Sequence, residues 1–318
     1  MQEFFFVPFI ISLFSTYFCV KWIIPRLNNR KITGIDMNKK DKPEIPEMGG
    51  LSVIFGFIMG IYSEVILASL VNDFDSLTFY LFASLVAILG ISLIGIIDDL
   101  IGMSQRTKAI LPFLFSLHLG AFTNTEMYLP IFGYVEFGYF MILIVPIAIT
   151  SAANSANMLE GFNGLSCGLA IIISTSLIIM SIINEVHEGL YLLFPLLGAL
   201  IAFARFNVFP AKIFPGDTLT LFMGGVIGCA AMPNLKLEGT LLMLPMIFEF
   251  FLKLKSNFRA QCFATSFNGN VLKYDGKVES LTHLVMQNFR FTEPELVRFF
   301  WSIQFFLAIF VIALKYFN

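Results

Sequence analysis

Residues 78–99 read TFYLFASLVAILGISLIGIIDD, in which twenty uncharged, mostly apolar residues precede two adjacent aspartates. A helix needs about 20 such residues to cross the hydrocarbon core of a bilayer. The stretch therefore predicts a transmembrane helix over 78–97, and its end places Asp98 and Asp99 at a membrane surface.

The rest of the chain repeats this pattern. Apolar residues make up 57% of the 318 positions and charged residues only 13%, with a mean hydropathy of +0.82, whereas soluble domains carry about 25% charged residues. The net charge of −2 argues against a nucleic-acid-binding surface. We predict an all-α membrane protein with about ten transmembrane helices in one polytopic domain, 1–318. The expected spans are 4–24, 50–70, 78–97, 109–122, 138–154, 164–184, 189–207, 218–233, 237–254 and 299–316.

One sizeable segment, 255–298, lies outside these spans. It mixes polar and apolar residues and has turn signals at Asn268-Gly269 and Asp275-Gly276. We expect it to form a small strand-and-helix element over the cytoplasmic face.

The basic residues predict the orientation. The loops after the first, third, fifth, seventh and ninth spans, with Lys21 at the mouth of the first, hold 18 of the 20 Lys and Arg residues. Only Lys236 and Lys315 fall on the other side. Because short cytoplasmic loops carry an excess of Lys and Arg, we expect these five loops to face the cytoplasm and both termini to face outward.

Ionisable residues inside the spans are scarce, chiefly Glu64, His118 and Glu249. Transporters place such groups along the path of their cargo. Glu249 lies four residues before Lys253, which favours a helical ion pair near the membrane interface. The distribution favours chemistry at the cytoplasmic surface over transport.

Polar motifs gather in the cytoplasmic loops. Asp98 and Asp99 at a helix C-terminus oppose the helix dipole and call for a cation, supplied by Mg²⁺ or by Arg106 and Lys108, unless they form a solvated boundary pair. NSANMLEGFNGLSCG, 154–168, contains three asparagines, more than capping and turns readily explain. In FPGDTLTLF, 214–222, Asp217 is either a helix N-cap or a metal ligand beside a phosphate. Acids, amides and separated cations on one face describe a site for Mg²⁺ and a nucleoside diphosphate.

IPEMGG (45–50), IIDDLIGMSQRTK (96–108), NSANMLEGFNGL (154–165) and FPGDTLTLF together resemble the polyprenyl-phosphate N-acetylhexosaminyl-1-phosphate transferases. The chain looks most like their archaeal and eukaryotic dolichyl-phosphate N-acetylglucosaminephosphotransferase branch, and the resemblance covers nearly its whole length. The family fold has ten transmembrane helices and a cytoplasmic active site. Asn163-Gly164 replaces an acidic motif of the bacterial relatives, and the last loop has His283 in place of their His cluster.

The resemblance implies roles for individual residues. For catalysis, Asp98 and Asp99 would lie beside the acceptor phosphate and Lys108 close to the phosphates. For the metal, Asp217 and Asn157 would hold Mg²⁺, with Mn²⁺ as an alternative. For substrate binding, Asn163, the backbone of Gly161 and the ring of Phe214 would hold uracil, Glu47 would shape the nucleotide pocket, Arg259 would reach the pyrophosphate, and Asn154 would belong to the same set. Arg259 is the one clear counterpart of the branch's basic cluster.

The implied reaction transfers N-acetylglucosamine-1-phosphate from UDP-N-acetylglucosamine to dolichyl or another polyprenyl phosphate and releases UMP, the first step of lipid-linked oligosaccharide synthesis for N-glycosylation. We expect direct attack by the lipid phosphate. Another UDP-N-acetylhexosamine donor and a lipid-linked sugar transporter or flippase are the alternatives. The expected location is the cell membrane, or the endoplasmic reticulum membrane in a eukaryote; a homodimer is left open.

Overall fold

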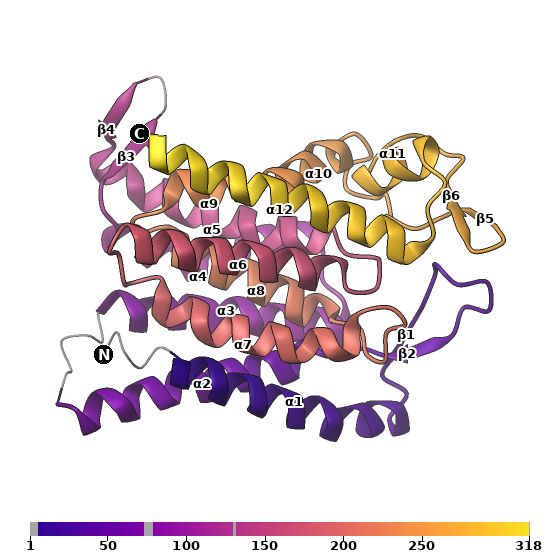
Figure 1. Ribbon diagram of the computed structural model, residues 1–318, viewed down its shortest axis with the longest axis horizontal. Coiled ribbons are helices and arrows are strands. Elements are labelled where there is room, and N and C mark those ends of the chain that lie inside the picture. The colour runs from indigo at the N-terminus through magenta and orange to yellow at the C-terminus, as the bar shows by residue number, and fades with distance from the viewer. Residues whose placement is uncertain (1–5, 73–78, 130–131, 318) are drawn as a thin grey trace.

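The computed structural model describes residues 6–72, 79–129 and 132–317, and it is a mostly helical bundle whose long helices run roughly side by side (Figure 1). The helices are α1 (Phe6–Asn29), α2 (Gly50–Leu70), α3 (Phe79–Ile101), α4 (Gln105–Ser116), α5 (Met141–Met158), α6 (Leu165–Ile183), α7 (Leu190–Asn207), α8 (Gly216–Ala231), α9 (Lys236–Leu242), α10 (Leu244–Leu254), α11 (Leu281–Asn288) and α12 (Glu293–Phe317).

Seven of the described helices are long and apolar enough to cross a membrane: α1, α2, α3, α5 with the turn before it, α6, α7 and α12. The chain is therefore a multi-pass membrane protein. The expected spans 109–122, 218–233 and 237–254 instead contain shorter helices, so a total of ten spans stays a prediction. The last of them is divided at Met243, between α9 and α10, and Pro245 in the first turn of α10 cannot donate the hydrogen bond that would continue α9.

The outer helices expose apolar side chains, as a lipid-facing surface requires. On α1, Phe14, Phe18 and Trp22 lie at i, i+4 and i+8 and are all more than half exposed. Such a stripe would be unfavourable in water and is expected where hydrocarbon covers it.

Helix α8 lies inside the bundle and contacts α2, α3, α5 and α7. Its residues from Thr218 to Ala231 are all buried. Glycines permit this close packing: a Cβ on Gly95 of α3 would lie 2.6 Å from the carbonyl oxygen of Asp217, and one on Gly224 would lie 2.5 Å from the carbonyl oxygen of Ala152 on α5. Small residues allow membrane helices to approach backbone to backbone, and here they hold the N-terminus of α8, with Asp217, in place.

Three two-stranded antiparallel sheets lie at the ends of the bundle: β1 (Thr33–Ile35) with β2 (Glu44–Pro46), β3 (Glu126–Leu129) with β4 (Gly133–Glu136), and β5 (Ser266–Asn268) with β6 (Val271–Lys273). Figure 1 shows β1–β2, β5–β6 and α11 at one end, and β3–β4 with the start of α1 and the end of α12 at the other. The first two hairpins were not expected from the sequence. Within 255–298 the structure has β5–β6 and α11; that they form one element over the cytoplasmic face stays a prediction.

The loop after α10 is anchored to the bundle through Glu249 and Lys253. Their side chains form the expected i,i+4 ion pair, at 3.8 Å, and Glu249 is fully buried. Glu249 also accepts a hydrogen bond from the backbone N–H of Leu281 at the start of α11 (2.7 Å), and Lys253 Nζ donates to the carbonyl of Met158 (2.5 Å). The loop is thus held against the end of α5.

Candidate functional site

A polar cluster forms where α3, α4, α5 and α8 meet at one end of the bundle. Lys108, in the first turn of α4, donates from Nζ to Asp217 Oδ2 at 2.5 Å and forms an ion pair with Asp98 at the end of α3. Asn157, at the end of α5, donates from Nδ2 to the same Asp217 oxygen at 3.0 Å. Lys108 therefore supplies a positive charge to Asp98 and Asp217 from within the chain.

The side chains of this cluster differ in how much of their surface is exposed. The side chains of Asp98 and Lys108 are 7% and 11% exposed, whereas that of Asp217 is 27% exposed. Burial alone would lower the pKa of Lys108, but Asp217 and Asp98 outweigh it and raise that pKa above its ordinary value. Lys108 therefore carries a positive charge, and Asp217 is the acid of the cluster most open to a ligand.

Asp99 has a different environment from Asp98. Its Oδ1 accepts the backbone N–H of Asp217 at 2.8 Å, and its Oδ2 accepts the backbone N–H and the hydroxyl of Thr218 at 2.9 and 2.6 Å. Asp99 thus caps the N-terminus of α8 from a distant helix. The interpretation of Asp217 as an N-cap is wrong, because Asp217 lies within the first turn and the N-cap position is Pro215.

Beside Asp217 lies a cavity of about 160 Å³. It brings together five residues expected at the nucleotide or metal: Glu47, Gly161, Asn163, Phe214 and Asp217. Burial, and then the charges of Asp99 and Asp217, raise the pKa of Glu47. The cavity therefore combines an aromatic ring, an amide and carboxylates, and Lys108 contacts one of its walls.

Two expected site residues lie elsewhere. Asn154 Nδ2 donates to the carbonyl oxygens of Lys108 (3.1 Å) and Thr150 (3.0 Å), so its amide joins α5 to α4, and it is absent from the cavity lining. Arg259 is exposed in the segment after α10. Among the residues that the structure describes, no ion pair joins its side chain to the cluster.

The structure adds cavity residues that the sequence analysis did not select. Glu160 lines the cavity, its Oε2 is buried and has no hydrogen-bond partner in the described part of the chain, and burial raises its pKa to about 7. Asp36 also lines the cavity, and Asn38 Nδ2 donates to the carbonyl of Gly161 at 2.6 Å. The sequence signal for Glu160 was its position inside NSANMLEGFNGL; Asp36 and Asn38 lie in an ordinary-looking basic loop.

A divalent cation is compatible with this donor set. The described residues contain no group of three His, Cys, Asp or Glu side chains arranged as a metal site, but Mg²⁺ commonly takes only one or two carboxylates and completes its shell with substrate phosphates and water. Asp217 and Asn157 offer a carboxylate and an amide oxygen once the Asn157 amide turns over. Asp98 and Asp217 both pair with Lys108, so two carboxylates share one positive charge and leave room for a cation to offset the remainder.

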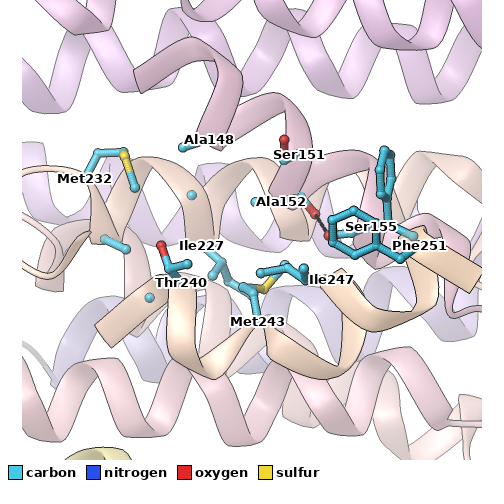
Figure 2. Close-up of a pocket in the computed structure, with 14 residues that line it drawn as sticks. Ala148, Ser151, Ala152, Ser155, Ile227, Met232, Thr240, Met243, Ile247 and Phe251 are labelled. Atoms are coloured by element: carbon cyan, nitrogen blue, oxygen red, sulfur yellow. Dashed lines mark hydrogen bonds between the residues drawn. The ribbon is translucent and has the colours of Figure 1, made fainter. Parts of the chain in front are cut away.

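A second cavity, of about 300 Å³, lies between α5, α8, α9 and α10. Figure 2 shows Ala148, Ser151 and Ser155 on one side and Ile227, Thr240, Met243 and Ile247 on the other. None of its lining residues is charged. Its α5 wall ends at Ser155, two residues before Asn157, so this apolar groove and the polar cluster share helix α5.

The fold and the site define a multi-pass membrane protein with a phosphate-compatible polar centre at one end of its bundle. Residues 81–234 match the model of glycosyl transferase family 4. This chain is 33% identical to a protein of Saccharolobus solfataricus named UDP-N-acetylglucosamine–dolichyl-phosphate N-acetylglucosaminephosphotransferase. The match covers 97% of this chain and 96% of that protein. A protein of the same name from Sulfolobus acidocaldarius is also 33% identical, over 97% and 94%. A phospho-N-acetylmuramoyl-pentapeptide-transferase of Caldicellulosiruptor bescii is 30% identical over 58% and 59%. The chain belongs to glycosyl transferase family 4.

Proposed function

We propose that this protein transfers N-acetylglucosamine-1-phosphate from UDP-N-acetylglucosamine to dolichyl phosphate and releases UMP. The observation that carries the proposal is the Asp98–Lys108–Asp217 cluster at the wall of a polar cavity, in a bundle whose helix α5 also lines an apolar groove. The near full-length relatives that bear the name of this activity support the choice of substrates.

The polar cavity is the proposed site of the donor. The Phe214 ring and the Gly161–Asn163 loop offer a flat face and hydrogen-bonding groups for uracil, and Glu47 borders the same space. Asp217 and Asn157 would hold Mg²⁺, or Mn²⁺ in its place, and the metal would offset the repulsion between donor and acceptor phosphates. Lys108, which contacts the same Asp217 oxygen as Asn157, would add a positive charge.

The reaction needs no strong base, because a phosphate monoester is already largely ionised at neutral pH. An oxygen of the lipid phosphate bonds to the β-phosphorus of the donor, and the bond from that phosphorus to the bridging oxygen breaks. UMP leaves with the electron pair. Direct attack is supported by the aspartates: Asp98 pairs with Lys108 and accepts the N–H of Met103 at 2.6 Å, and both oxygens of Asp99 accept bonds from α8, so neither acid is a free nucleophile.

The apolar groove is the proposed site of the dolichyl chain. Ala148→Phe would fill the groove from α5, whereas Leu143→Phe on the same helix is the matched control, because Leu143 is half exposed on the outer surface. We expect Ala148→Phe to raise the KM for dolichyl phosphate about tenfold, the effect of losing roughly 1.4 kcal/mol, without changing the KM for the donor. Equal acceptor KM values for the two variants would exclude this groove.

We further propose that the end carrying the cluster faces the cytoplasm. The 18 basic residues that predicted the orientation would then satisfy the excess of positive charge found in cytoplasmic loops. Cysteine labelling tests this: Lys40→Cys, before β2, should be protected from an impermeant reagent in sealed, right-side-out vesicles, whereas Tyr134→Cys in β4 should react. The reverse pattern would invert the topology.

Turnover tests the reaction. Purified protein in lipid nanodiscs, supplied with labelled UDP-N-acetylglucosamine, Mg²⁺ and dolichyl phosphate, should produce one UMP for each labelled pyrophosphoryl lipid. A panel of UDP-N-acetylhexosamines identifies the preferred sugar. Asp217→Asn should remove most turnover, while Asp41→Asn, at an exposed position of the first loop, should not. Absence of a labelled lipid with every donor, combined with movement of lipid-linked sugar across the membrane, would favour a flippase.

A further inference from the structure

A buried charged network holds Asn163 in the wall of the nucleotide cavity. Asp36 Oδ2 accepts from Asn163 Nδ2 at 3.2 Å, and Glu293 Oε1 accepts the backbone N–H of Asn163 at 2.9 Å. Lys39 joins the two acids, because its Nζ lies 3.1 Å from Asp36 Oδ2 and pairs with Glu293 Oε2. Asp36, Asn163 and Glu293 are each no more than 5% exposed.

The network connects three distant parts of the chain: the loop after α1, the connection between α5 and α6, and the first residue of α12. Burying charges is expensive, and apolar packing of the same volume is often at least as stable. The ammonium of Lys39 also lies 4.4 Å from the centre of the Phe209 ring. Holding three segments together is therefore an incomplete explanation for these residue types.

The network has a consequence that apolar packing would lack: it determines which way the Asn163 amide points. An ionised carboxylate only accepts hydrogen bonds, so the NH₂ group of Asn163 must face Asp36. The amide oxygen Oδ1 then occupies the other side of the group. It accepts no hydrogen bond from any residue in the described ranges, and Asn163 lines the cavity.

This inference rests on the proposed function. We propose that Asp36, Lys39 and Glu293 are positioning residues that hold the Asn163 amide with its oxygen available to the cavity, so that the site selects uracil over cytosine nucleotides. Uracil carries an N–H donor at N3, which an amide oxygen can accept. Cytosine has a lone pair at N3, which repels that oxygen. An Asn163 amide turned by 180° would reverse this preference.

Asp36→Asn tests the inference, because an asparagine at position 36 can present either its oxygen or its NH₂ group and so frees Asn163 to turn. Thermal shifts measured against UMP and CMP give the affinity of each nucleotide without requiring turnover. We expect the wild-type protein to prefer UMP by at least about tenfold, the effect of one hydrogen bond. In Asp36→Asn this preference should fall to near unity, because UMP binds more weakly and CMP more tightly.

Lys39→Met provides a second variant if Asp36→Asn fails to fold. Without the ammonium, the two acids repel, Asp36 moves away from Asn163, and the Asn163 amide is free to turn. Lys39→Arg should restore the preference, and Lys40→Met, at an exposed neighbouring position, is the matched control. In the turnover assay the donor KM should rise with little change in kcat.

Two failures are distinguishable. Wild-type protein that binds UMP over CMP but transfers no sugar phosphate would remove the proposed function and leave the selection intact. Variants that lose stability yet keep the wild-type ratio of UMP to CMP affinity would show that the network is structural only, and would overturn the inference.

Discussion

Replacing Asp99 by Asn separates the capping of α8 from the chemistry at Asp217. Asp99 accepts three hydrogen bonds from the first turn of α8: two from backbone N–H groups, of Asp217 and Thr218, and one from the Thr218 hydroxyl. Asparagine keeps one acceptor oxygen, but its NH₂ group then faces a donor. The substitution should therefore loosen the helix end that carries Asp217.

The expected cost follows from these three bonds. A lost N-cap costs about 0.5–2 kcal/mol, and a hydrogen bond to a charged group contributes roughly 1.5–3 kcal/mol. Because the three bonds share one carboxylate, they are not additive. We expect Asp99→Asn to lower the free energy of unfolding by about 2 kcal/mol and Asp99→Ala by about 3 kcal/mol.

Reversible unfolding in mixed micelles, followed by circular dichroism, measures this cost, and UMP release measures turnover on the same samples. Asp99→Asn should lose stability and retain part of its kcat, whereas Asp217→Asn should lose turnover with little change in stability. Asp41→Asn, on the exposed surface of the first loop, controls for the loss of one negative charge. Abolished turnover at wild-type stability in Asp99→Asn would refute the capping role and place Asp99 in the chemistry.

Three further predictions concern the same end of the bundle. Lys108→Met leaves Asp98 and Asp217 without their shared cation, so UMP release should fall by at least about 100-fold and recover in part in Lys108→Arg; full turnover in Lys108→Met would remove this lysine from the site. Burial raises the pKa of Glu160 from 4.5 to about 7, so the folded protein binds this proton more tightly than the unfolded chain and loses up to roughly 3 kcal/mol of stability as pH rises from 4.5 to 7. Glu160→Gln should thus be more stable than wild type at pH 8 and similar to it at pH 4.5; a stability difference that does not depend on pH would contradict this pKa. Gly216 has φ +69° and faces Asp99, so Gly216→Ala should lower the free energy of unfolding by more than the roughly 1–2 kcal/mol that the backbone conformation alone costs. Gly269→Ala, at φ +64° in open space, measures that backbone cost separately. Equal losses in the two variants would mean that the cap tolerates the added methyl group.

The gathering of the polar residues at one end could be predicted from the sequence. Apolar segments of nearly constant length alternate with loops, and each segment is expected to cross the membrane once. Loops that follow every second span must therefore lie at the same end of the bundle. This reasoning brought Asp98, Lys108, Asn157 and Asp217 together without coordinates, and the structure places them in one hydrogen-bonded cluster. It carries no information on which way a side chain points within that end, and Asn154 and Arg259 were therefore grouped with the cavity although the structure places them outside it.

Hydrophobic segment length and loop charge, both local properties, determined from the sequence alone that this chain is a helical membrane protein with its polar groups at one end. Only the tertiary structure determined which acid forms the ion pair and which acid caps a helix. Asp98 and Asp99 are neighbours in the sequence, yet Asp98 pairs with Lys108 while Asp99 caps a helix that begins more than a hundred residues later. Asp36 and Glu293 reach Asn163 across separations of 127 and 130 residues. The physical reason is that a hydrogen bond depends on the direction of a side chain about its helix and on the packing of neighbouring helices, and neither is set by the residues on either side of it in the chain.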